Sequence, residues 1–432
     1  MTQPLERPAA YAAYLTDLTS PRPQDEFITD RAGAGSEIAH RVELRLDELR
    51  DDLVGLSHTV HANPELGFEE HHAAAAVVET VRRHGIDIEV GVYGLETAFR
   101  ANVGEGRPRV AILAEYDALP GIGHGCGHNV ICAAGVGGFL AAAPFVEAMG
   151  GSIVLIGTPA EEGGSGKEYI ARAGGFDDVD CAMMVHPAGS TTAAPIHVGL
   201  RQVEVEFRGL GAHASAFAFM GRNALDACVS AYSMIAQLRQ HILPTDRIHG
   251  IITDGGDKPN IVPERAGALW FVRSERLDTL LELTDRIDAI FEAAAAGTGT
   301  MVEARWDVNP LALPVRNNMP LANRFVLAQL ARGTEMKLRS PVPSGSTDMG
   351  NVSVRMPSIH PKIAICPSTV PAHTAEFAEY AGSATGDQGV IDGAAGLAMT
   401  ALDFLADPAL RSDVAADFAA SGGVVDVESL DR

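Results

Sequence analysis

The chain has 432 residues, of which 46% are hydrophobic and 21% are charged. This composition is that of a folded protein long enough for two or three domains, and it excludes a disordered chain. Aspartate and glutamate outnumber lysine and arginine by 56 to 33, so the formal net charge is −23. Nucleic acid and anionic membranes repel so acidic a chain, and we expect neither as a partner.

The cysteines argue against a disulfide framework. They are odd in number and scattered along the chain: Cys126, Cys132, Cys181, Cys228 and Cys366. Such a distribution is typical of a reducing compartment. Residues 1–36 form an N-terminal extension without the apolar core of a secretory signal, and the uncharged run over residues 130–146 is short for a membrane span. We therefore predict a cytoplasmic protein in which residues 130–146 form a buried helix.

Strand-like and helix-like segments follow one another through most of the chain. Leucine and valine recur every three or four residues over residues 37–60, which predicts an amphipathic helix. Four nearly continuous apolar runs each precede a glycine- or proline-containing loop: residues 109–117, 151–159, 180–187 and 362–367. Apolar strands without alternation are typical of a parallel sheet covered by helices on both faces. The sequence thus predicts an α/β fold with a mostly parallel sheet.

The middle of the chain shows a different pattern. Residues 203–207 alternate apolar side chains with glutamate, which indicates a strand with one wet face. The segment then continues with a helix, two strands, a helix and a strand, and this βαββαβ order is the ferredoxin-like split unit. The predicted organisation is a main domain over residues 1–196 and 309–432, an inserted domain over residues 197–308, and a peripheral helix or frayed end beyond residue 408.

Side chains that bind metals follow the predicted strands. In open parallel sheets, functional sites are built beyond the carboxyl ends of the strands. The candidates at these ends are Asp117, Cys126, His128, Glu161, Glu162, His186 and His373. Thiolate, imidazole and carboxylate groups together are the ligand set of a transition-metal site.

Each candidate also has a simpler interpretation when taken alone. Cys126 and His128 could be a small buried thiol beside a loop histidine, and paired glutamates usually form a solvated turn. Their coincidence at successive strand ends favours the metal site. Asp117 suits an orienting role toward an imidazole better than a ligand role, with a turn-forming role as the alternative. His360 is a rival to His373 as the last ligand.

Longer motifs occur in a fixed order: EYDALPGIGHGCGHN, TPAEEGG, VHP, GAHASA, PNIVPE and PAHTAEF. Over roughly residues 40–405 they resemble the aminoacylase/carboxypeptidase family of dinuclear metallopeptidases, and in particular its amidohydrolase branch. That branch includes aminobenzoyl-glutamate hydrolase and N-acyl-amino-acid amidohydrolases. The resemblance implies a catalytic α/β domain interrupted by a ferredoxin-like lid domain that also forms a homodimer.

The resemblance also implies roles for individual residues. The implied ligands of two divalent ions are Cys126, His128, Glu162, His186 and His373. Glu161 matches the general base, His213 matches the lid histidine, and Asn260 and Arg273 fall near its substrate-binding residues. Zinc suits this ligand set, and manganese, cobalt and nickel also bind such groups.

The predicted function is metal-dependent hydrolysis of the amide bond of a small N-acyl amino acid or dipeptide-like substrate by metal-activated water. One alternative is a dipeptidase or aminopeptidase that acts on a free amino group. The other is a non-catalytic metal-binding homologue. Glu161 beside five ligand-type side chains argues against this last alternative.

Overall fold

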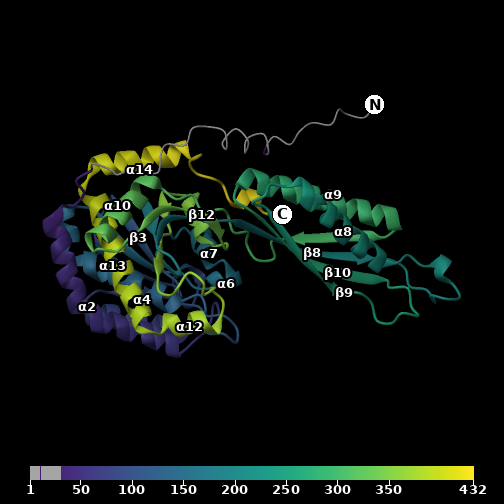
Figure 1. The fold of residues 1–432 in the computed structure, drawn as a ribbon, viewed down its shortest axis with the longest axis horizontal. Coiled ribbons are helices and arrows are strands. Elements are labelled where there is room, and N and C mark those ends of the chain that lie inside the picture. Colours follow the sequence, from purple (N-terminus) through teal and green to yellow (C-terminus); the bar gives the residue numbers. More distant parts are fainter. Residues whose placement is uncertain (1–9, 11–30) are drawn as a thin grey trace. The chain divides into compact units, whose positions relative to one another are not determined.

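The computed structural model describes Ala10 and residues 31–432, so most of the predicted N-terminal extension lies outside the described residues. The chain forms two compact units (Figure 1). In the described part, the larger unit comprises residues 31–196 and Val315–Asp426, and the smaller unit comprises His197–Pro314 and Val427–Arg432. Each unit has its own hydrophobic core.

A six-stranded mixed sheet forms the centre of the larger unit, in the order β1-β2-β4-β3-β5-β13. Its strands are β1 (Ile88–Val90), β2 (Phe99–Gly104), β3 (Arg109–Ala114), β4 (Ser152–Gly157), β5 (Cys181–Met183) and β13 (Ser358–Ile359). Strands β4, β3, β5 and β13 are parallel, whereas β2 is antiparallel to β4 and β1 to β2. The α/β class is as predicted, but the sheet has an antiparallel edge that the sequence did not indicate.

Strand β3 is buried on both faces. Val110, Ile112 and Ala114 join the main core, whereas Ala111 and Leu113 join a second core cluster. Because alternate side chains point to opposite faces, a strand covered on both sides is apolar throughout.

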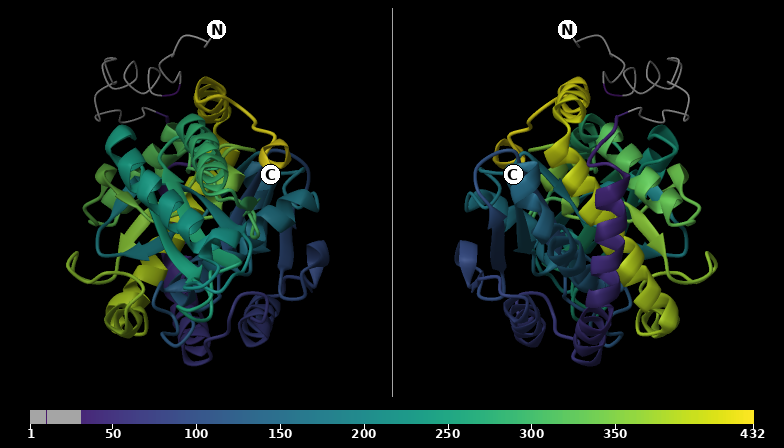
Figure 2. Two further views of the ribbon diagram at one scale, coloured as in Figure 1. Left: turned by 90° about the vertical axis from the view of Figure 1, so that its right-hand side faces the viewer. Right: turned by 90° about the vertical axis from the view of Figure 1, so that its left-hand side faces the viewer.

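The helices of this unit are α2 (Ser36–Ala62), α3 (His71–Arg83), α4 (His128–Ala142), α5 (Val146–Met149), α6 (Glu161–Gly164), α7 (Gly166–Arg172), α10 (Met319–Ala331), α11 (Met349–Ser353), α12 (Ala375–Ala381), α13 (Ala384–Ala406) and α14 (Pro408–Ala420). Figure 2 shows α2 and α13 side by side over one face.

Helices α4 and α13 pack against each other in the main core. His128–Met149 and Ala384–Ala406 are long and apolar enough to cross a membrane, but 89% of each apolar window is buried inside the structure. Glycine brings α4 close to its neighbours. A Cβ on Gly135 would lie 2.8 Å from the carbonyl oxygen of Leu113, and one on Gly138 would lie 2.8 Å from Cβ of Leu397. The segment predicted as a buried helix is therefore a tightly packed core helix.

Parts of two predicted strands belong to a second sheet, whose strand order is β12-β7-β14-β6. Its strands are β6 (His186–Ala188), β7 (Thr192–His197), β12 (Lys337–Ser344) and β14 (Lys362–Ala364). The sequence predicts one strand over residues 180–187, but the strand ends at Met183 and His186 begins β6. The predicted strand over residues 362–367 contains β14, while β13 pairs with β5 in the main sheet. Apolar patterning could not separate the two sheets, because buried strands of either sheet are equally apolar.

The smaller unit contains a four-stranded antiparallel sheet in the order β11-β8-β10-β9. Its elements along the chain are β8 (Gly199–Arg208), α8 (Ala224–Leu238), β9 (Arg247–Asp254), β10 (Arg265–Ser274), α9 (Leu277–Thr298) and β11 (Met301–Trp306). Helices α8 and α9 cover one face (Figure 1). Val203 and Val205 are buried beneath them, whereas Glu204 on the other face pairs with Arg305 at 2.7 Å.

Candidate metal centre

The loop before α4 brings Cys126, His128 and His186 together. Gly127, between the first two, has a φ of 77°, and a Cβ there would lie 2.6 Å from Cγ of Pro187. Glycine alone adopts this conformation without strain and leaves that space free. Nδ1 of His186 lies 2.6 Å from the carbonyl oxygen of Pro187, and its Nε2 lies 3.4 Å from Sγ of Cys126. The ring is thereby oriented with Nε2 toward the thiol.

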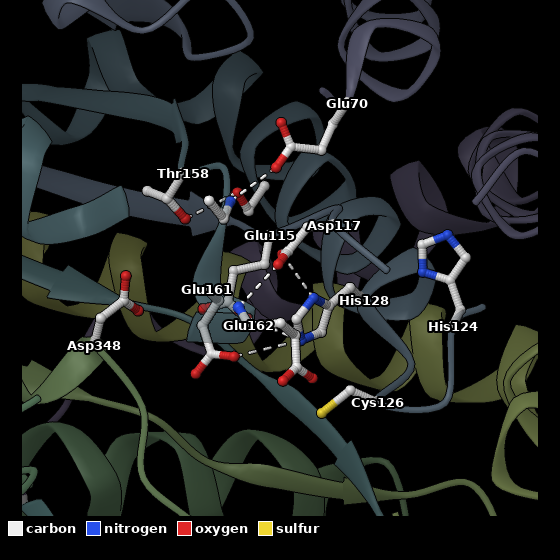
Figure 3. A network of polar contacts seen from close by, with 12 residues as sticks. Glu70, Glu115, Asp117, His124, Cys126, His128, Thr158, Glu161, Glu162 and Asp348 are labelled. Carbon is white, nitrogen blue, oxygen red and sulfur yellow. Dashed lines mark hydrogen bonds and ion pairs between the residues drawn. The ribbon is translucent and has the colours of Figure 1, made fainter. Parts of the chain in front are cut away.

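Asp117 connects two of the predicted ligands (Figure 3). Its Oδ1 lies 2.9 Å from Nδ1 of His128, and its Oδ2 accepts a hydrogen bond of 2.9 Å from the backbone N–H of Glu162. A carboxylate on Nδ1 fixes the tautomer of a histidine that binds metal through Nε2. Burial opposes protonation of His128, but the charge of Asp117 raises the pKa of the imidazole well above its usual value. Nε2 of His128 makes no hydrogen bond within the described residues.

The adjacent glutamates face different partners. Ala160, just before them, has a φ of 58°, a left-handed conformation that is uncommon for alanine and often marks functional sites. Oε1 of Glu162 lies 3.3 Å from Nε2 of His373, whereas Oε2 of Glu161 lies 3.9 Å from Nε2 of His128. His373 itself has a φ of 65°. Two consecutive side chains therefore reach two different parts of the same centre.

Three groups of donor atoms in the described residues have the spacing of metal ligands. They are Cys126, His128 and His186; Cys126, Glu162 and His373; and Glu115, His128 and Glu161. Within each group all atoms lie within 4.8 Å of one another. Two ligands on opposite sides of an ion are about 4.6 Å apart when each bond is about 2.3 Å. The first two groups share Cys126 and contain all five implied ligands.

His360 lies in none of these groups of described residues. Its ring packs edge-on against that of His186, with the ring centroids 5.6 Å apart. His373 is thus better placed as the last ligand. His124, in the same loop as Cys126, lies with Nε2 3.0 Å from the carbonyl oxygen of Val60, away from the ligand groups. Burial, and then the charge of His128, lower the pKa of His124 to about 3, so this ring is neutral.

Buried negative charge is concentrated around the donor atoms. Lys167 is fully buried and contacts Glu115, and its Nζ lies 2.7 Å from Oδ1 of Asp348. Burial, followed by the charges of Glu115, Asp348 and Glu162, raises the pKa of Glu161 well above its usual value. Carboxylates so close to one another are stabilised by cations. The donor set and the unpaired Nε2 of His128 therefore fit two divalent ions.

Glu115, Lys167 and Asp348 were not among the residues predicted from sequence to form the site. Glu115 directly follows the apolar strand β3. A charged residue at the end of a buried strand could have indicated that it belongs to the site. Asp348 gave no such signal, because its partner Lys167 is 181 residues away in the chain.

His213 and Asn260 lie together in the smaller unit. His213 forms an isolated β-bridge with Ile261, and the backbone N–H of Ala214 donates to the carbonyl oxygen of Asn260 at 3.0 Å. Asn260 also lines a shallow surface pocket with Ser215. Two neighbouring polar side chains are thus available in one loop cluster.

Arg273 lies elsewhere in the same unit. Strand β10 pairs Arg265 with Arg208 at one end and Arg273 with Leu200 at the other. His213 follows the end of β8 at Arg208, whereas Arg273 pairs with Leu200 near the other end of that strand. Eight residues of strand, at ~3.3 Å per residue, separate these two ends by about 26 Å. The structure therefore brings His213 and Asn260 together but not Arg273.

Comparison with known proteins identifies the family. The family model described as "Peptidase family M20/M25/M40" matches residues 111–390. The chain belongs to this family. It is 36% identical over 398 residues to an Xaa-Arg dipeptidase from Mus musculus, covering 88% of this chain and 92% of that protein. It is also 34% identical over 297 residues to one of the subunits of p-aminobenzoyl-glutamate hydrolase from Escherichia coli, covering 63% of this chain and 61% of that protein.

Solved structures share the fold of this M20-family chain. A dinuclear metal-binding peptidase from Bacillus subtilis aligns with a TM-score of 0.63 and 19% identity, covering 82% of this chain and 99% of that one. An aminobenzoyl-glutamate utilization protein from Klebsiella pneumoniae aligns with a TM-score of 0.65 and 21% identity, covering 84% and 98%. The predicted membership of a hydrolase family of metallopeptidases is confirmed.

The shared position of Cys126 leads to a test. Replacing Cys126 with serine removes one donor from two ligand groups, so the C126S variant should lose bound zinc while it remains folded. Elemental analysis of the purified protein measures the zinc, and circular dichroism checks the fold. A zinc content equal to that of the wild type would show that Cys126 is only a buried thiol.

Proposed function

We propose that the protein hydrolyses the amide bond of a small dipeptide-like or N-acyl amino acid substrate at a centre of two divalent ions, with zinc as the preferred ion. The observation that carries this proposal is the pair of ligand groups that share Cys126, with Glu161 beside them. A sulfur atom shared in this way can bind both ions, and Glu161 lies outside both groups. The carboxylate of Glu161 is thereby available to take a proton.

Bound divalent ions would polarise the scissile carbonyl and make water acidic enough to attack near neutral pH. The residues of this chain supply the remaining steps. Glu161 takes the proton of the attacking water and transfers it to the leaving amine. Asp117 fixes His128 and the backbone of Glu162, so the position of Glu161 relative to the ligands is maintained.

Net charge favours a cationic substrate. A chain with a formal charge of −23 raises the local concentration of cations and lowers that of anions. A relative that is similar over 88% of the chain is an Xaa-Arg dipeptidase, whose name specifies a basic C-terminal residue. We therefore propose dipeptides with a basic C-terminal residue as the preferred substrates. N-acyl amino acids form the second candidate class.

A substrate panel tests this preference. We expect the fastest hydrolysis for dipeptides that end in arginine or lysine, slower hydrolysis for hippurate-like compounds, and slow hydrolysis for aminobenzoyl-glutamate, which carries two negative charges. A chelator should abolish all three activities, and added zinc should restore them. Activity that survives complete metal removal would refute the metal-dependent mechanism.

The two glutamates separate proton transfer from metal binding. The E161Q variant should keep its metal content yet lose about 10²–10⁴-fold in kcat, the range for removal of a general base. The E162Q variant should instead lose metal, because Glu162 is a donor in a ligand group. Elemental analysis and steady-state kinetics measure both effects. If the two variants lose metal and activity alike, the assigned roles are wrong.

We also propose that the smaller unit is a ferredoxin-like lid domain that forms a homodimer in the cytoplasm. The element order βαββαβ and the antiparallel sheet support this assignment. One dipeptide cannot contact both His213 and Arg273 of one unit across about 26 Å. Both could contact a substrate only if they came from different subunits. His213 would then act on the substrate of the partner subunit as a hydrogen-bond donor to the oxyanion.

Mixed dimers test this arrangement. The H213A variant should have a lower kcat with an unchanged metal content. If His213 acts across subunits, one site of a mixed dimer of H213A and E161Q chains contains both native residues. The activity of the mixed dimer should then be about half that of a wild-type dimer. If His213 acts within its own chain, both sites stay defective and no activity returns. Dimers purified by two different tags provide the sample.

A further inference from the structure

The three ligand groups cannot all be filled at once. Cys126 belongs to two of them, and His128 belongs to the group with Cys126 and to the group with Glu115 and Glu161. A thiolate sulfur has several lone pairs and can bridge two ions. An imidazole nitrogen has one lone pair and binds only one ion. The ion on His128 can therefore bind with Cys126 and His186 or with Glu115 and Glu161, but not with both pairs.

The position formed by Glu115 and Glu161 is a built site and not a surface cluster of acids. The side chains of Glu115 and His128 are fully buried, and Oε2 of Glu115 lies 3.6 Å from Nε2 of His128. Neither atom has a hydrogen-bond partner within the described residues. At 3.6 Å the two atoms are too far apart for a hydrogen bond, and a cation bound to both of them would satisfy both.

Lys167 fixes the direction of Glu115. Its ammonium group contacts Oε1 of Glu115, which leaves Oε2 as the oxygen that faces His128. Asp348 accepts a 2.7 Å hydrogen bond from the same ammonium group and neutralises its charge. One ammonium group therefore offsets only part of the negative charge of Glu115, Asp348 and Glu161 around the third group of donors. The side chain of Glu161 is 10% exposed, whereas those of Glu115 and His128 are fully buried.

We propose that Glu115, His128 and Glu161 form an alternative, oxygen-rich position for the ion on His128, selective for hard cations such as Mn²⁺ and mutually exclusive with the position at Cys126 and His186. Carboxylate oxygens favour harder cations, whereas thiolate and imidazole favour zinc. This inference rests on the proposed dinuclear centre. It also predicts that an excess of a hard cation lowers the rate of hydrolysis, because Glu161 cannot act as the proposed base while it binds an ion.

The C126S variant isolates this position, because serine removes the thiolate that the other two groups share. We expect apo C126S protein to bind one equivalent of Mn²⁺, measured by the loss of the free Mn²⁺ signal in electron paramagnetic resonance. Adding E115Q to this background should weaken Mn²⁺ binding at least 10-fold, within the ~10–100-fold range for metal-site substitutions. The E115D change retains the charge next to Lys167 but shortens the side chain. It should also weaken binding while the fold is preserved.

Glu168 provides the matched control. Its side chain is also fully buried, it neighbours Lys167 in sequence, and it binds Arg355 at 2.8 Å, but it lies in none of the ligand groups. E168Q in the C126S background removes a buried carboxylate without touching the proposed position, so Mn²⁺ affinity should not change. A drop equal to that of E115Q would mean that loss of a buried ion pair alone explains the effect.

Two results with the C126S protein would each overturn the inference. One is a folded C126S protein that binds no Mn²⁺, and the other is Mn²⁺ binding that is the same with and without Glu115. A failure of the proposed function looks different, because wild-type protein would then retain hydrolysis after complete metal removal. In the wild type, millimolar Mn²⁺ should inhibit the zinc-loaded enzyme, and an unchanged rate would contradict the link to Glu161.

Discussion

The concentration of negative charge beyond the strand ends is the constraint on which the rest of the site depends. Five carboxylates and a thiol face a small region in which Lys167 is buried as their counter-ion: Glu115, Asp117, Glu161, Glu162, Asp348 and Cys126. Burying like charges is costly unless cations offset them. Two divalent ions, as proposed, would remove that cost, so metal binding would stabilise this unit as well as make it reactive.

The backbone turns of the loops follow from the same requirement. The donors come from several separate segments of the chain, and these segments must approach closely enough to share an ion. Gly127 permits contact with Pro187, and Ala160 and His373 adopt positive φ values to direct their neighbours inward. Such conformations cost about 1–3 kcal/mol each where they are strained. Asp117 connects two of these segments and so helps to offset that cost, and bound ions would add to this effect.

Much of this site could be predicted from the sequence, since its donors follow apolar strands in short motifs. Asp117, Cys126 and Glu162 were predicted this way because local patterning marks strand ends, and the structure brings them close together. The partition of the strands into two sheets was not predictable, since pairing between distant segments leaves no local trace. Lys167 and Asp348 were missed for the same reason, because the need to neutralise Glu115 exists only after the chain has folded.

The central proposal is that one sulfur atom, that of Cys126, would bind both ions of a single centre. Anomalous diffraction from crystals of the zinc-loaded protein at the zinc absorption edge tests it most directly. The account predicts two peaks, each about 2.3 Å from Sγ of Cys126, the length of a zinc–sulfur bond. A single peak, or two peaks of which one lies beyond bonding distance of that sulfur, would contradict it.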